Sequence, residues 1–493
     1  MKRPSVKLTL LFLLAITGLA SACEQQREGA VKVVVIGEPP EIVEPAAGPL
    51  SPGEALLLAN VAQGLVRFDA RGQIEPGLAE RWNVSDDGLS YIFRLAASEW
   101  PDGRRITAYQ AARILRRQIG RSSGNPIRDT LGAIDEVVAM TDRVLEIRLS
   151  APRPNLLQLL AQPEMALVLD GQGSGPFRLD DDKGPNGELR LVRSVAVPDE
   201  DEERREEVLL ASADVRAAVR AFADGRTDLV LGGGFADLPY ARQVHLPRNA
   251  LQFDPVSGLF GLVPARADGP VADIELRRLL TQAIDREAMI AALDVPGLLP
   301  RATVLEAGLD DVPDPAVPAW AAAPIAERRP LLAAEAQRLF GEAERPLLRI
   351  ELPDGPGSEL LLRLLARDWG ALGIRVERAA PGQGGDLRLV DAVAPSTSPA
   401  WFLRRFRCGE TPVCEQPVDE LLEAARAAPV AAQRAALLYE AAQLVDAQQL
   451  FIPIAAPVRW SLVSERVEGF AGNRFAIHTL TGLGERLMRE RAE

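Results

Sequence analysis

Short runs in which apolar and polar residues alternate predict β-strands along most of this chain. Residues 31–37 form a β-branched run that ends at a glycine, the pattern of a strand buried on both faces. Residues 90–95 and 144–149 alternate between apolar and polar positions, which is typical of half-buried strands.

Between these runs the apolar spacing changes to the period of a helix. Thr107 is placed to cap a helix that runs to Ile119. Residues 275–293 carry apolar side chains every three or four positions and predict one amphipathic helix. Residues 359–372 and 431–450 predict two more helices.

The order of these elements indicates an α/β fold. Residues 347–352 and 373–377 read as strands on either side of the helix at 359–372, which is the order of a parallel crossover. The Pro- and Ala-rich residues 311–326 read as a connecting loop, and the charge run at 198–203 as a solvated one.

Composition limits the size of the fold and its partners. The chain has 493 residues, of which 47% are hydrophobic, and this length suggests two or three lobes. A net charge of −13 argues against a nucleic-acid partner, because phosphate binding needs a basic surface.

The N-terminus carries an export signal. A positive start is followed by an apolar run at residues 8–16, which is too short to span a membrane. The sequence ending at Cys23 resembles a bacterial lipobox, although Ala20 stands where Leu is commoner. We therefore expect residues 1–22 to be a lipoprotein signal peptide and residues 23–30 a tether lipidated at Cys23. An ordinary signal peptide with a chance cysteine is the alternative.

Two further cysteines, Cys408 and Cys414, lie close together in a loop-like stretch. In an oxidising compartment such a pair predicts a local disulfide. A metal site is the rival interpretation. It lacks ligands, because the only histidines are His245 and His478 and neither is near in sequence.

Several blocks of the sequence together resemble the family 5 extracellular solute-binding proteins, the dipeptide, oligopeptide and nickel receptors of ABC importers. The blocks occur in the family's order, at residues 60–69, 76–82, 85–91, 100–108, 173–179, 276–287 and 451–470. Each block is weakly specific, and their agreement in order carries the resemblance.

The resemblance implies a two-lobed, type II-like periplasmic-binding-protein fold. The first part of lobe I would be residues 31–245, lobe II residues 246–458, and the return to lobe I residues 459–493. The lobes would close by a hinge motion around a peptide-like or other small solute. The closed, monomeric receptor would then deliver it to the membrane permease of an ABC importer, with no cofactor or metal.

The resemblance also makes peptide recognition doubtful. Peptide receptors of this family usually carry a Trp and an Asp shortly before a Pro-x-x-Phe-Leu stretch, and the Asp pairs with the peptide's amino terminus. That stretch is residues 399–403 here, so the acidic position falls on Pro395 and the aromatic one on Ala392. Asp391 is a possible substitute, because one carboxylate in a dry cleft could bind an amine.

Other candidate ligand residues lie near the expected cleft. Trp401 and Phe402 stand beside the basic cluster of Arg404, Arg405 and Arg407, whose guanidinium groups suit a carboxylate or phosphate. Salt bridges from this cluster to Glu410 and Glu415 are the alternative.

Three more candidates lie near the expected first crossover and the end of the first strand. Glu38 follows the first strand, and Phe235 and Phe260 flank the crossover. Residues 260–264 are apolar throughout, where the family usually has an Asn, which favours a ligand less polar than a peptide.

Two other classes of protein remain open. A hydrolase would fit the Gly-x-Ser-x-Gly sequence at residues 120–124, but that sequence follows a predicted helix rather than a strand. A lipoprotein that keeps the fold but acts as a sensor or assembly partner would fit the lost Trp and Asp positions. The sequence favours a receptor without enzymatic activity over both.

Overall fold

The computed structural model describes residues 29–196 and 203–484. The expected signal peptide at residues 1–22, Cys23 and most of the charge run at 198–203 lie outside the described residues. None of the helices within the described ranges is both long and apolar enough to cross a membrane.

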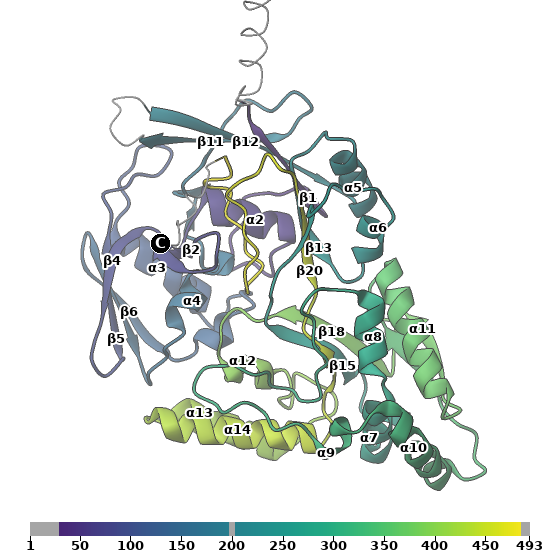
Figure 1. Ribbon diagram of the computed structural model, residues 1–493. Helices are drawn as coiled ribbons and strands as arrows, with labels where there is room; N and C mark the ends of the chain where they lie inside the picture. The colour runs from purple at the N-terminus through teal and green to yellow at the C-terminus, as the bar shows by residue number, and fades with distance from the viewer. Residues whose placement is uncertain (1–28, 197–202, 485–493) are drawn as a thin grey trace, which may run out of the picture.

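Lobe I is built on a seven-stranded sheet (Figure 1). Its central strand β1 (Val31–Ile36) pairs in parallel with β12 (Glu203–Ala213) and β13 (Leu229–Gly234). Val33 and Val35 are buried in one hydrophobic core, and Val34 and Ile36 on the opposite face are partly buried against another, so both faces of β1 are covered, the second less completely. The remaining strands of the sheet are β10 (Arg178–Leu179), β11 (Leu189–Ala196), β20 (Arg459–Val463) and β14 (Leu251–Phe253).

A second sheet of four strands forms a separate unit of lobe I, called here the small-sheet unit, with a hydrophobic core of its own. Helix α3 (Ala108–Ile119) packs against it and is capped as predicted, since the Thr107 hydroxyl accepts from the Gln110 N–H and the Gln110 side chain accepts from the Thr107 N–H. The four strands are β4 (Ala79–Val84), β5 (Ser90–Leu95), β6 (Ile134–Thr141) and β7 (Val144–Leu149).

Shorter elements complete lobe I and connect its two sheets. They are α2 (Pro52–Val61), β2 (Val66–Phe68), β3 (Ile74–Pro76), η1 (Arg128–Leu131), α4 (Leu156–Leu160), η2 (Pro163–Met165), β8 (Val168–Leu169), β9 (Gln172–Gly173), α5 (Val215–Ala223) and α6 (Leu238–Arg242).

Lobe II contains a five-stranded sheet covered on both faces by helices. Strand β15 (Gly258–Pro264) is buried throughout, and its alternate side chains enter two different hydrophobic cores. Phe260 and Leu262 face the core shared with α7, α8 and α11, while Leu259 and Val263 face the core shared with α12–α14. The other strands are β16 (Leu347–Glu351), β17 (Arg375–Ala379), β18 (Leu387–Val393) and β19 (Ile452–Ala455).

The predicted parallel crossover is present, because β16 and β17 pair in parallel and α11 (Pro356–Gly370) lies between them in the chain. The single helix predicted at 275–293 is wrong: Ile284 is extended and Asp285 caps a second helix. The predicted loop at 311–326 includes a short helix and the start of another. The helices of lobe II are η3 (Pro270–Ala272), α7 (Ile274–Ala283), α8 (Arg286–Leu293), α9 (Ala319–Ala322), α10 (Ile325–Phe340), α12 (Pro399–Arg404), α13 (Gln416–Ala427) and α14 (Ala431–Ala447).

Two short crossovers join the sheets of the lobes, so that lobe II is inserted into lobe I. The first lies at residues 254–257, because β14 still pairs with β20 in the sheet of lobe I and β15 already belongs to lobe II. It therefore falls later than the expected boundary at 245/246. The second crossover, at residues 456–458, separates β19 from β20 and lies where the boundary at 458/459 is expected.

Candidate ligand site between the lobes

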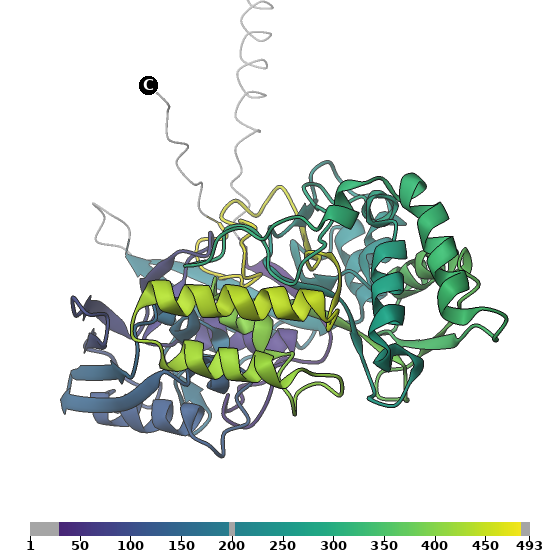
Figure 2. The ribbon, with the colours of Figure 1, turned by 90° about the horizontal axis from the view of Figure 1, so that it is seen from below.

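A cavity of about 370 Å³ lies where the small-sheet unit of lobe I faces the helices α12–α14 of lobe II. Figure 2 shows α13 and α14 side by side, extending from lobe II across the blue strands of the small-sheet unit. This cavity is called the interlobe cavity below. Lobe I supplies lining residues from 119–133 and 153–159, and lobe II supplies them from 310–311, 398–407 and 422–438.

Backbone groups of the loop after β18 form hydrogen bonds to lobe I along one side of the seam between the lobes. The Gln162 Nε2 donates to the Pro395 carbonyl at 2.6 Å, and the Thr397 N–H donates to Gln158 Oε1 at 2.9 Å. Because these partners belong to different lobes, both hydrogen bonds hold the lobes in a closed arrangement.

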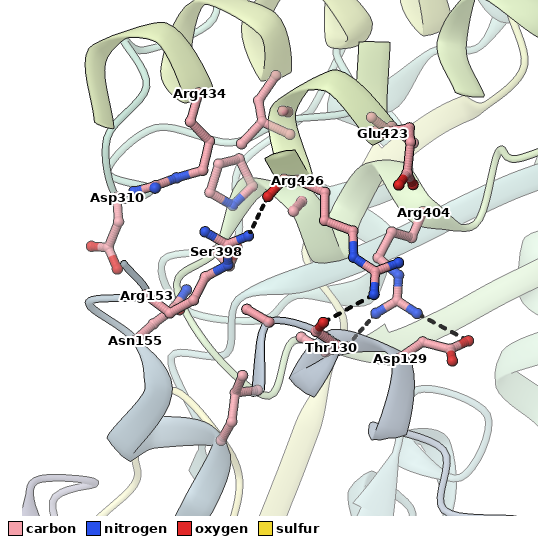
Figure 3. Close-up of a pocket in the computed structure, with 18 of the residues that line it drawn as sticks. Asp129, Thr130, Arg153, Asn155, Asp310, Ser398, Arg404, Glu423, Arg426 and Arg434 are labelled. Carbon is pink, nitrogen blue, oxygen red and sulfur yellow. Dashed lines mark hydrogen bonds and ion pairs between the residues drawn. The ribbon is translucent and has the colours of Figure 1, made fainter. Parts of the chain in front are cut away.

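Arginines make further contacts across the seam (Figure 3). The Arg404 guanidinium donates to Thr130 Oγ1 at 2.6 Å and lies 3.2 Å from Asp129 Oδ2. Arg426 donates to the Gly132 carbonyl at 2.9 Å. Further along the seam, Arg434 of lobe II donates to the Pro152 carbonyl at 3.0 Å, and Arg153 of lobe I donates to the Arg426 carbonyl at 3.2 Å.

The lining of the interlobe cavity is strongly basic. Seven arginines and four carboxylates line it, which leaves a net charge of plus three. The arginines are Arg121, Arg128, Arg153, Arg404, Arg407, Arg426 and Arg434, and the carboxylates are Asp129, Asp310, Asp311 and Glu423.

The pKa of Arg153 is lowered to about 10, mainly by burial and then by the positive charges of Arg434 and Arg426, while Asp311 opposes the shift. The guanidinium remains charged near neutral pH.

The candidate residues named from the sequence fall in several places. Arg404 lines the interlobe cavity, and its ionic partner is Asp129 across the seam rather than Glu410 or Glu415. Arg405 lies instead with Asp391 in a separate hollow of about 490 Å³ on lobe II. The basic cluster is therefore divided between two surfaces.

Three of the aromatic candidates belong to hydrophobic cores. Phe235 and Phe260 are each 1% exposed and pack edge to face against one another, and Phe402 is 0% exposed. Trp401 is partly buried and packs edge to face on Phe402. These positions place Phe235, Phe260 and Phe402 in the cores and not in a ligand cavity.

The remaining candidates also lie outside the interlobe cavity. Glu38 is exposed just after β1 and lines neither hollow. The apolar residues 260–264 are buried in β15, so they carry no information about the polarity of a ligand. Asp391 forms an ion pair with Arg459, whose Nη1 lies 2.8 Å from Asp391 Oδ1.

Cys408 and Cys414 form a disulfide in the structure, with Cα atoms 5.2 Å apart. The disulfide closes a short loop directly after Arg407, and the Cys408 N–H donates to the Asp419 carboxylate. Across the described ranges no group of three His, Cys, Asp or Glu side chains is arranged to hold a metal ion.

Most partners across the seam escape prediction from the sequence, among them Arg153, Gln162, Arg426 and Arg434. Arg426 and Arg434 look like ordinary polar positions of α13 and α14, and Gln162 precedes a turn. Only Arg153 carries a local signal, because Pro152 and Pro154 on either side restrict the backbone that presents it.

A molecule of two lobes that meet over a cavity at their seam has the architecture of a solute-binding protein. The family model "Bacterial extracellular solute-binding proteins, family 5 Middle" matches residues 73–385. The chain belongs to this family of bacterial extracellular solute-binding proteins.

Individual relatives are distant. The chain is 31% identical to the probable deoxycholate-binding periplasmic protein YgiS of Escherichia coli over 22% of its own length and 24% of that protein. It is 24% identical to the probable di/tripeptide-binding protein 5 of Pseudomonas aeruginosa over 83% of its own length and 87% of that protein.

Among solved structures, Haemophilus influenzae OppA in complex with RPPGFSPFR superposes with a TM-score of 0.76 at 15% identity, covering 92% of this chain and 98% of that one. The likeness at this identity concerns the fold.

Proposed function

We propose that this protein is the receptor of an ABC-type importer, and that it captures a small solute in the interlobe cavity and delivers it to the membrane permease. The observation that carries the proposal is the position of the cavity, which is lined by both lobes and spanned by hydrogen bonds between them. A ligand held there contacts both lobes and so favours the closed form. A permease could then distinguish the loaded receptor from the empty one by its shape.

The solute need not be a peptide. The relatives are named for deoxycholate and for di- or tripeptides, so the family does not fix one ligand class. In this chain the acidic position expected of peptide receptors is Pro395, whose carbonyl accepts from Gln162. Asp391, the possible substitute, is neutralised by Arg459. Both observations favour a solute recognised through groups other than a free amine.

The test is mass spectrometry of small molecules released when the exported protein, purified from its host, is denatured. A reproducible compound that also raises the melting temperature of the folded protein is the expected result, because a ligand that binds only the folded state must stabilise it. No bound compound, together with no thermal shift against peptide, sugar, metal and organic-acid pools, would overturn the receptor proposal in favour of a sensor or assembly role.

The export and anchoring of the receptor are part of the same proposal. Cleavage before Cys23 and lipidation of that residue would leave a short tether between the membrane and lobe I. The full chain should fractionate with membranes, whereas a Cys23→Ser variant should not be held there by a lipid. Wild-type protein that stays in the soluble fraction with an unmodified Cys23 thiol would refute the anchor and leave the binding role intact.

A further inference from the structure

The arginines of the interlobe cavity are not all balanced by acidic side chains. Asp129 lies within ion-pair distance of Arg128 and Arg404, and Asp311 lies 2.9 Å from Arg434. Among the described residues, no carboxylate lies within ion-pair distance of the other four arginines of the lining, Arg121, Arg153, Arg407 and Arg426.

The hydrogen bonds of these arginines also leave capacity for a ligand. Arg153 donates to the carbonyls of Pro152 and Arg426, and Arg426 donates to the carbonyl of Gly132. All three acceptors are neutral. The Nε of Arg407 is buried and has no hydrogen-bond partner in the described part of the chain.

A cavity with several guanidinium groups that have no carboxylate partner favours a negatively charged ligand. The two lobes bring Arg153 into contact with the Arg426 carbonyl, and the pKa of Arg153 is lowered first by burial and then by the positive charges of Arg434 and Arg426. Within the protein, the closing of the lobes therefore brings like charges together. A bound anion would offset this repulsion. It would also accept charge-assisted hydrogen bonds from the arginines, which are stronger than hydrogen bonds between neutral groups.

We propose that the interlobe cavity binds a small organic anion with two or three negative charges, carried by carboxylate or phosphate groups, which Arg153 of lobe I and Arg407 and Arg426 of lobe II grip together. The proposal rests on the receptor function proposed above and names the class of its solute. Its charge matches the net plus three of the lining.

The size and the apolar part of the lining agree with an organic molecule. The volume of about 370 Å³ lies at the lower end of the range for small-molecule sites. Leu159, Pro154, Pro399, Leu422 and Leu438 provide apolar wall between the arginines, suited to a short carbon skeleton.

Binding by arginines of both lobes also explains how such a ligand would close the receptor. Arg153 belongs to the small-sheet unit, while Arg407 and Arg426 belong to lobe II. An anion that bonds to all three gains its full interaction only when the seam is closed, so its binding energy is coupled to closure.

The experiment is isothermal titration calorimetry of the full-length, exported protein with citrate, succinate, inorganic phosphate and glucose 6-phosphate, and with an N-acetylated dipeptide amide, which is uncharged. The expected result is that at least one of the anions binds and that added salt lowers its affinity. The amide should not bind. The relative affinity of carboxylates and phosphates then assigns the ligand group.

The Arg153→Gln and Arg426→Gln variants locate that binding. Each substitution should lower the affinity for the anion about tenfold or more, because each removes a charged hydrogen-bond donor from the cavity. Arg113→Gln on α3 and Arg363→Gln on α11 are the controls, since both arginines are exposed and outside the cavity lining, and they should leave affinity within about twofold.

Two results overturn the anion proposal while the receptor function stands. One is an uncharged solute that binds in preference to all four anions, and the other is anion binding that the Arg153 and Arg426 variants leave unchanged. If no solute of any class binds, the receptor function itself fails.

Discussion

Arg459 and Asp391 join the two lobes at the hinge, with Arg459 Nη1 2.8 Å from Asp391 Oδ1 and Nη2 3.3 Å from the Asp391 carbonyl. Arg459 opens β20 of lobe I directly after the second crossover, and Asp391 lies in β18 of lobe II. Burial raises the pKa of the Asp391 carboxyl, while the charge of Arg459 and its hydrogen bond oppose the shift. The pair therefore fixes a carboxylate at the pivot of the two lobes.

An Arg459→Gln variant should lower the free energy of unfolding by about 1–3 kcal/mol, because it leaves the buried Asp391 carboxylate without its counter-charge. Urea unfolding measures the loss. Arg363→Gln, at an exposed position of α11, is the matched control and should change stability by less than about 0.5 kcal/mol. An unchanged stability of the Arg459 variant would show that this ion pair does not stabilise the fold.

Local patterns predict much of this fold. The strand, helix and strand between residues 347 and 379 are all found, because each has a clear period and the crossover needs only neighbouring elements. The break between α7 and α8 is missed, because apolar residues continue across Ile284 while Asp285 caps a new helix. A capping aspartate inside a periodic run is a weak signal.

The site is less predictable for a physical reason. Gln162 and Pro395 are 233 residues apart, and Arg404 and Thr130 are 274 apart, so no local period encodes their contact. Aromatic candidates chosen by position, such as Phe235 and Phe260, prove to be core because a buried apolar ring is stabilised by packing. Arg404 was chosen for its positive charge rather than for its position, and it does line the interlobe cavity.

Weakening the seam should open the molecule. A Gln162→Ala variant loses the 2.6 Å hydrogen bond to the Pro395 carbonyl, which contributes about 1 kcal/mol to the closed form. We expect a larger radius of gyration by small-angle X-ray scattering. Gln443→Ala, at an exposed position of α14 that is absent from the cavity lining, should leave it unchanged. Equal scattering from both variants would show that this contact does not hold the lobes together.

Removing the disulfide should destabilise the loop beside Arg407. Cys408 and Cys414 are six positions apart, and closing so short a loop stabilises the fold by about 2 kcal/mol in the chain-entropy account. The double variant Cys408→Ser and Cys414→Ser should lose about that much in urea unfolding without reductant, and should match the wild type when reductant is present. Two free thiols from this pair in the denatured, unreduced wild type would contradict the prediction.

The pH dependence of stability should carry a contribution from Asp446 of α14. Burial raises the pKa of its carboxyl from the ordinary 3.8 to about 7, although the hydrogen bond from the Val304 N–H, at 2.8 Å, favours the charged form. Because the folded pKa lies above the unfolded one, the protonated form is favoured by folding. The contribution is fully present below pH 3.8, falls as the pH rises towards about 7, and is constant above that.

An Asp446→Asn variant keeps an oxygen that accepts from Val304 and removes the titration. Its unfolding free energy should therefore equal that of the wild type near pH 4 and exceed it near pH 8, with the difference growing by roughly 1.4 kcal/mol per pH unit in between. Other carboxyls with raised pKa values, such as Glu306 and Asp237, are present in both proteins and cancel in the difference. The control variant Asp135→Asn, at an exposed position of β6, should instead give a stability curve parallel to that of the wild type across the whole pH range. A parallel curve for Asp446→Asn as well would mean that this carboxyl titrates near its ordinary pKa and that its burial is relieved when it is charged.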